Sequence, residues 1–187
     1  MSETKQLKWK LEDQVNDYVK KELESLGLQN QKNFNVESNM SEYMKEALKG
    51  SAKTKNKTNF GKPDFHIEGY SIPVVIENKL HTNKLVSETK NGLKMDEKSI
   101  NNYAVNGAVY YAQKMIASAK YHEVIAVGIA GDSKEDVSIA VYYVFGTSAE
   151  PKYMSNYKNL NFLENKKTFN SFYEDATLSE KEKHRIL

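Results

Sequence analysis

The chain of 187 residues contains no cysteine, which excludes disulfide scaffolds, thiolate zinc sites, iron–sulfur clusters and cysteine nucleophiles. It also lacks an apolar run of about 20 residues, the length that a membrane-spanning helix needs. Its longest apolar runs, at residues 124–130 and 139–145, are as long as strands. Residues 1–6 contain no apolar segment of the kind found in secretory signals. The sequence therefore predicts a single soluble, cytoplasmic domain with no membrane partner.

Arginine is nearly absent, since Arg185 is the only one and lysine carries almost all of the positive charge. The net charge is +2, far from the strongly basic footprint of an autonomous nucleic-acid binder. Arginine makes the commonest bidentate contact to guanine edges, whereas lysine neutralises phosphate as a point charge. Any contact of this chain with nucleic acid should therefore be blind to sequence.

The hydrophobic pattern predicts an α/β domain, with a central mixed β-sheet of about four strands flanked by helices. The predicted helices cover residues 7–26, 40–48 and 103–119, followed by a last helix that starts at Ser179. The predicted strands cover residues 64–68, 72–79, 124–130 and 137–145, with a short extended piece at 34–36. Residues 82–99 are expected to form a long loop. Because a helix joins the second long strand to the third, that pair should be parallel.

The stretch that carries chemistry spans residues 61–79, where two short strands should form a hairpin. One register places four apolar side chains on the same face, by pairing Phe65 with Ile76 and Ile67 with Val74. A slip by one residue would mix apolar and charged side chains on both faces, which burial penalises. In the favoured register Asp64 lies opposite Glu77, and Lys79 shares a face with Glu77.

Two carboxylates directly opposite each other in a hairpin destabilise it unless a positive charge lies between them. Lys79 is one candidate for that charge, and a divalent cation is the other. Carboxylate oxygens with several retained waters suit Mg²⁺, and Mn²⁺ is the expected substitute. A metal beside a lysine, next to a segment with five lysines at residues 49–62, is suited to attack on a phosphodiester.

The residues Pro63-Asp64 followed by Glu77-Asn78-Lys79 resemble the signature of the PD-(D/E)xK nuclease superfamily. More narrowly, residues 47–53 and 103–112 look like the amino-terminal endonuclease domain of fused, type IIG-like restriction–modification enzymes. Those enzymes join nuclease, adenine methyltransferase and DNA recognition in one polypeptide. The resemblance covers residues 40–145 and implies a restriction-endonuclease-like core with Mg²⁺-dependent hydrolysis of DNA.

The resemblance also implies roles for four residues of the motif. Asp64 and Glu77 would ligate Mg²⁺, together with the backbone carbonyl of Asn78. Lys79 would orient the attacking water and stabilise the negative charge that develops on the phosphoryl group.

Further residues of the site follow from the same resemblance. Such enzymes often add a glutamate from the first core helix, for which Glu46 is the choice and Glu42, one turn earlier, is the alternative. Many relatives carry a Gln-x-x-x-Tyr pattern on the helix after the motif. Here Tyr111 occupies the tyrosine position, but Gly107 stands at the glutamine position, and Gln113 does not restore the spacing.

The domain organisation expected from the resemblance is a nuclease domain at residues 1–170 and a C-terminal helical segment at 171–187. That segment would link to a following domain outside this chain. The expected partners are double-stranded DNA, contacted through its backbone, and tethered methyltransferase and target-recognition domains. Double-strand cleavage would add a transient dimer.

Other interpretations stay open at this stage. The same residues could serve a structure-directed nuclease of repair or recombination, or a catalytically inert, DNA-associated interaction domain. The acidic pair and Lys79 could form a structural salt bridge, and Glu46 could lie on a solvated helix face. Of the four histidines, His81 is the one expected near a substrate, because it follows Lys79 by two residues.

Overall fold

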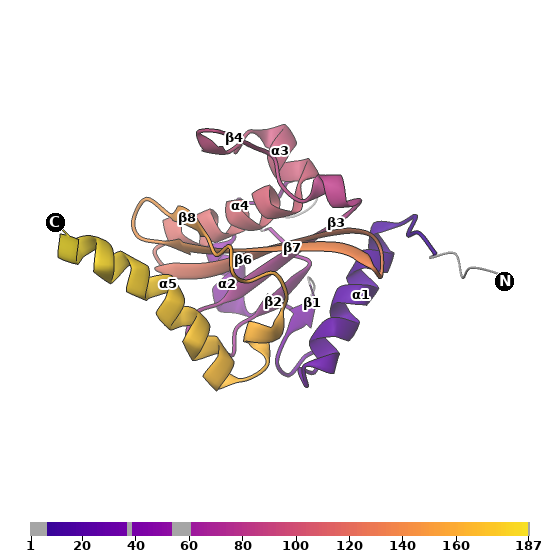
Figure 1. Ribbon diagram of the computed structural model, residues 1–187, viewed down its shortest axis with the longest axis horizontal. Coiled ribbons are helices and arrows are strands. Elements are labelled where there is room, and N and C mark those ends of the chain that lie inside the picture. The colour runs from indigo at the N-terminus through magenta and orange to yellow at the C-terminus, as the bar shows by residue number, and fades with distance from the viewer. Residues whose placement is uncertain (1–6, 37–38, 54–60, 187) are drawn as a thin grey trace.

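A central six-stranded mixed sheet, with helices on both faces, organises the chain in a computed structural model (Figure 1). The structure describes residues 7–36, 39–53 and 61–186, with side chains up to Leu178. In sheet order, the strands are β1 (Asn35–Val36), β2 (Phe65–Ile67), β3 (Val74–Leu80), β6 (Glu123–Ser133), β7 (Asp136–Phe145) and β8 (Glu150–Tyr153). The prediction of about four strands was too low, because β1 and β8 extend the sheet at its two edges.

The strand pairing agrees with the register expected from the apolar pattern. β2 and β3 are antiparallel, with Phe65 opposite Ile76 and Ile67 opposite Val74. β3 and β6 are parallel, as the intervening helix predicted, and β6 continues into β7 through a tight antiparallel turn. Glu77, Asn78 and Lys79 therefore lie on β3, near the middle of the sheet, and Asp64 directly precedes the adjacent β2.

The helices divide between the two faces of the sheet. On one face lie α1 (Glu12–Ser25) and α5 (Lys166–Ile186), and on the other lie α2 (Glu42–Ala47) and α4 (Ala104–Ala117). α1 begins later than predicted, because Leu7 and Leu11 are exposed and its buried stripe starts at Val15. No helix within the described ranges combines the length and the apolarity needed to cross a bilayer.

The last helix begins at Lys166, well before the predicted start at Ser179. Its N-terminus is fixed by reciprocal hydrogen bonds, in which the Thr168 amide donates to Asn165 Oδ1 and the Asn165 amide donates to Thr168 Oγ1. The helix packs against the sheet through Phe169, Phe172 and Ala176. The boundary expected after residue 170 thus falls inside a packed helix.

Residues 82–99 are more ordered than the predicted loop. They form η1 (Thr82–Lys84), a hairpin of β4 (Glu88–Thr89) and β5 (Gly92–Leu93), and the start of α3 (Glu97–Asn102). The buried Asn106 of α4 holds the base of the hairpin. Its side chain accepts from the Ser87 amide at 2.9 Å and donates to the carbonyls of Ser87 at 2.8 Å and Lys94 at 2.6 Å. This buried amide therefore joins the two ends of the hairpin, which projects from the body beside α3 (Figure 1).

Candidate functional site

An open cavity of about 530 Å³ lies beside the C-terminal half of β3, beyond the residues that pair with β2. It is lined by residues of α1, β1, β3 and the start of β2, namely Glu12, Asp13, Asn16, Val36, Asp64, Phe65, Glu77 and Lys79. Three of the residues singled out in the sequence, Asp64, Glu77 and Lys79, therefore line one cavity.

Asp64 and Glu77 hold each other in place through the backbone. The Asp64 amide donates to Glu77 Oε1 at 3.0 Å, and the Asn78 amide donates to Asp64 Oδ2 at 2.8 Å. These two side chains thereby bridge the two segments just beyond the Phe65–Ile76 pair, where the pairing of β2 with β3 ends. Both carboxylates are consequently fixed side by side where the β2–β3 pairing ends, and we call this pair, Asp64 and Glu77, the acidic corner.

The electrostatic environment of this corner is unfavourable for two negative charges. The side chain of Glu77 is only 6% exposed. Burial raises the pKa of Asp64 well above its usual range, and the neighbouring charge of Glu77 raises it further. The Asn78 amide and the ammonium of Lys53 act in the opposite direction without cancelling the effect. The corner therefore favours any additional positive charge.

Lys79 faces α1 across the cavity. Its ammonium lies 3.5 Å from Glu12 Oε1, at the first turn of that helix. The negative charge of Glu12 also raises the pKa of Asp64. Sequence reasoning missed Glu12, although a signal was present: Glu12 precedes the buried Val15 by three residues, so it continues the buried stripe of α1.

Asn78 connects the motif strand to the same helix. Its side chain is fully buried, and its Nδ2 donates to Asn16 Oδ1 at 2.8 Å. Among the described residues, no donor reaches Asn78 Oδ1. This hydrogen bond therefore couples the packing of α1 to the position of β3.

The structure does not bring Glu46 or Glu42 to this cavity. Both lie on α2 with exposed side chains, and Glu42 pairs with Lys45 at 3.2 Å. α2 packs toward α4 through Met44 and Ala47, which sets the direction of its other side chains. The helix that lines the cavity is α1, which lies earlier in the chain than the helix chosen from sequence.

A second lysine reaches Glu77 from the lysine-rich segment. Lys53 Nζ lies 2.8 Å from Glu77 Oε2 and 4.5 Å from the centre of the Tyr111 ring. Tyr111 is buried, and this burial, with the nearby charge of Glu77, raises the pKa of its hydroxyl. Lys55 and Lys57 of the same segment lie outside the described residues.

His81 lies directly after β3 but is not among the residues that line the cavity. Its Nδ1 is 2.6 Å from Asp132 Oδ1, and this contact lowers the pKa of Asp132. The amide and hydroxyl of Thr82 also donate to Asp132. The Trp9 amide donates to the Asp132 carbonyl at 2.7 Å. Asp132 therefore fixes the exit of β3 beside the segment that leads into α1.

The cavity fits a hard cation by its donor chemistry. No group of three or more histidine and acidic side chains within the described ranges is arranged to hold a metal. Asp64 and Glu77 nevertheless offer two neighbouring carboxylates at an open cavity, and burial together with the charge of Glu77 raises the pKa of Asp64 there. Hard oxygen ligands supplied by one or two carboxylates, completed by water, are what Mg²⁺ takes in proteins.

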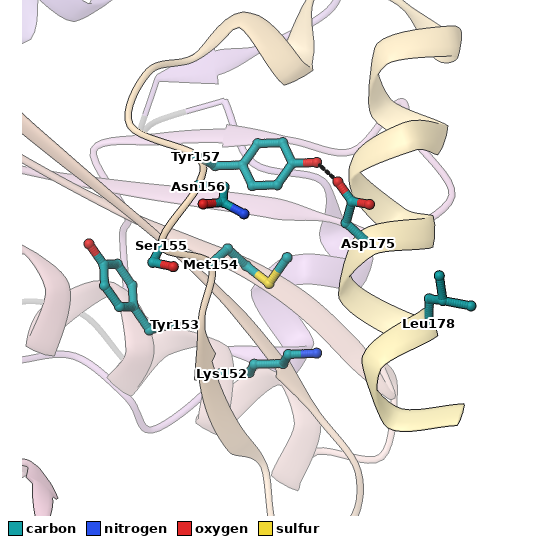
Figure 2. Close-up of a pocket in the computed structure, with 8 residues that line it drawn as sticks. All are labelled: Lys152, Tyr153, Met154, Ser155, Asn156, Tyr157, Asp175 and Leu178. Atoms are coloured by element: carbon teal, nitrogen blue, oxygen red, sulfur yellow. Dashed lines mark hydrogen bonds between the residues drawn. The ribbon is translucent and has the colours of Figure 1, made fainter. Parts of the chain in front are cut away.

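A smaller cavity of about 290 Å³ lies toward the other edge of the sheet, between β8 and α5 (Figure 2). The Tyr157 hydroxyl donates to Asp175 there, and Lys152 Nζ donates to the Ala176 carbonyl at 2.8 Å. None of the residues predicted to form a site lies in it.

Comparison with known proteins supports a link to restriction–modification. The chain is 31% identical over 164 residues to the "Type II restriction enzyme and methyltransferase RM.BcgI" of Heyndrickxia coagulans. The alignment covers 87% of this chain but 24% of the relative, so the chain spans about a quarter of that protein's length. No protein-family model and no solved structure matches the chain. Most of the chain is therefore similar to one part of a restriction enzyme and methyltransferase.

Proposed function

We propose that this chain is the DNA-cleaving domain of a restriction–modification enzyme and hydrolyses phosphodiester bonds with Mg²⁺. The observation that carries the proposal is the convergence of Asp64 and Glu77 on one cavity, with the ammonium of Lys79 at its side. The similarity to a restriction enzyme and methyltransferase supports the same function. We further propose that the core is of the PD-(D/E)xK type, which the placement of Asp64 directly before β2, and of Glu77 and Lys79 on the adjacent β3, supports.

The proposed division of roles follows the position of each group. Asp64 and Glu77 would hold Mg²⁺ with the carbonyl of Asn78, and a bound divalent cation supplies charge stabilisation at a phosphoryl oxygen and activates water. Lys79 would orient the attacking water and stabilise the developing negative charge. Glu12, 3.5 Å from Lys79, would hold that ammonium in position, so we assign to Glu12 the helix glutamate expected at Glu46.

The proposal includes a division of labour with other domains. With one arginine and a net charge of +2, this chain is poorly equipped to read bases, so it would contact the DNA backbone. Sequence recognition would come from tethered methyltransferase and target-recognition domains. Cutting both strands would bring two copies of the cavity to one site, as a transient dimer.

The decisive experiment measures cleavage of supercoiled plasmid by the wild type and by Lys79→Ala, with and without Mg²⁺. The wild type should nick or linearise the plasmid with Mg²⁺ or Mn²⁺ and lose activity in EDTA. Lys79→Ala should lower the rate by about a hundredfold or more, because it removes a preorganised charge from the transition state. Lys21→Ala, an exposed lysine of α1 away from the cavity, is the matched control and should retain the wild-type rate.

Other outcomes would redirect the proposal. Cleavage of junctions or flaps in preference to plain duplex would identify a structure-directed nuclease instead. Equal cleavage by the wild type and Lys79→Ala would rule out the catalytic role assigned to Lys79. Calorimetry without divalent-cation binding that depends on Asp64 and Glu77 would leave an inert interaction domain.

A further inference from the structure

Lys53 contacts the acidic corner beside α4, whereas the cavity-lining Lys79 lies beside Glu12 of α1. It is not among the residues that line the cavity, yet its ammonium lies 2.8 Å from Glu77 Oε2. The side chain of Lys53 is only 13% exposed. An ammonium so far removed from water is stable only where the protein supplies its partners. Here Glu77 supplies the charge and the Tyr111 ring supplies a π-face at 4.5 Å.

Gly107 provides the space that this ammonium occupies. A Cβ atom at position 107 would lie 2.4 Å from Lys53 Nζ and 3.4 Å from Glu77 Oε2. Gly107 lies inside α4, where glycine is among the least favourable residues for a helix. Its absence of a side chain is therefore explained by the lysine that fills the space beside Glu77.

We propose that Lys53 is an internal cation of the site, whose ammonium neutralises Glu77 and so lowers the affinity of the site for a divalent cation. This inference rests on the proposed function, because it concerns the metal that Asp64 and Glu77 would hold. Two cations that share one carboxylate repel each other, and their binding is coupled reciprocally. Lys53 would thus neutralise part of the charge of the acidic corner when no metal is bound. It would also raise the metal concentration at which the site fills.

The test is calorimetric titration of Mg²⁺ into the folded chain, without DNA. Lys53→Met, which keeps the length of the side chain and removes its charge, should bind Mg²⁺ about tenfold more tightly than the wild type, within the usual range of coupling between sites. Lys49→Met, at an exposed lysine of the same segment, makes the same charge change and should leave the affinity unchanged. A gain in affinity separates this role from a structural one, because loss of packing would weaken the site.

A second variant approaches the same contact from the helix. Gly107→Ala places a methyl group where the ammonium lies, so Lys53 must withdraw from Glu77. The methyl group would also lie 3.0 Å from the Ile100 carbonyl oxygen, which requires only a small shift. Gly107→Ala should raise the affinity for Mg²⁺ as Lys53→Met does, and the double variant should show no further gain.

The outcomes are distinguishable. Equal or weaker binding of Mg²⁺ by Lys53→Met, while the wild type binds it through Asp64 and Glu77, overturns the inference and leaves the proposed function standing. A wild type that binds no divalent cation overturns the proposed function and this inference with it. If Gly107→Ala fails to fold, as judged by circular dichroism, Lys53→Met still decides the question.

Discussion

The cavity beside β3 and the cavity between β8 and α5 differ in the charges that line them. The cavity beside β3 is lined by four acidic residues and one lysine, and two of those acids are fixed side by side. In the cavity between β8 and α5, Lys152 donates to the Ala176 carbonyl, and Asp175 accepts from the Tyr157 hydroxyl (Figure 2). One cavity gathers like charges, whereas the charged side chains of the other have uncharged partners nearby.

At the cavity beside β3, the fold keeps two buried carboxylates together although this lowers its stability, which is expected where the carboxylates have a chemical role. Burying like charges together is unfavourable, and a sheet could avoid it with one neutral side chain. Perturbed carboxylates that share a cavity are typical of functional sites, whereas neutralised pairs are typical of packing. If that distinction is right, neutral substitutions at the first cavity should affect activity, and those at the second should affect only stability.

The largest effect is expected for Asp64→Asn. The substitution removes one of the two carboxylates, so DNA cleavage with Mg²⁺ should fall by about a thousandfold or more. Without metal, however, the free energy of unfolding should equal or exceed that of the wild type, because a like charge beside Glu77 is removed. Urea denaturation and plasmid cleavage measure the two quantities. A large loss of stability would show that the carboxylate pair is structural.

The stability of the metal-free protein should depend on pH in a direction that the buried carboxylate pair determines. Burial and the charge of Glu77 raise the pKa of Asp64, so the folded state holds this proton more tightly than the unfolded state does. Between the ordinary carboxyl pKa and the raised one, the contribution of Asp64 to stability should fall as pH increases. Mg²⁺ should counteract this fall, and Asp64→Asn should remove it. A wild-type stability that rises through this window because of Asp64 would contradict the assignment.

The next largest effect on cleavage shows whether α1, through Glu12, or α2, through Glu46, supplies the glutamate of the site. Glu12→Gln removes the partner of Lys79 and should lower cleavage by about 10- to 100-fold, as is usual for groups that orient the residues of a metal site. Glu46→Gln is the matched control on α2 and should leave the rate within about twofold, because its side chain is exposed and away from the cavity. The reverse result would restore the original prediction of Glu46.

The acidic corner could be predicted from the sequence because only one register of the hairpin places all four apolar side chains on one face and the charged side chains on the other. Phe65 and Ile76 could share a buried face only if Asp64 lay beside Glu77, and the structure has this pairing. Local alternation fixed the strands, and burial fixed their register. The β3–β6 pair followed from the intervening helix for a similar reason, since a parallel pair needs a crossover.

The contributions of α1 and Lys53 could not be predicted with the same security, because they depend on contacts between distant segments. No pattern in the neighbouring sequence indicates that Glu12 contacts Lys79. Lys53 was one of five lysines at residues 49–62, and the sequence does not distinguish it from the other four. The hairpin after β3 was missed for the same reason, since a buried amide on α4 organises it. The start of α5, by contrast, had a local signal in the reciprocal pair Asn165 and Thr168.

The smallest effect is expected at the second cavity. Tyr157→Phe removes the hydroxyl that donates to Asp175, while the ring keeps its edge contact with Phe172. Burial and this hydrogen bond raise the pKa of Tyr157 to about 12, so the hydroxyl stays protonated and remains a donor at neutral pH. The variant should lose about 1 kcal/mol of unfolding free energy and cleave DNA at the wild-type rate. Tyr153→Phe, at a half-exposed tyrosine of the same cavity, should change neither quantity. Reduced cleavage by Tyr157→Phe would mean that this cavity also serves the reaction, and that local satisfaction of polar groups does not separate structural cavities from functional ones.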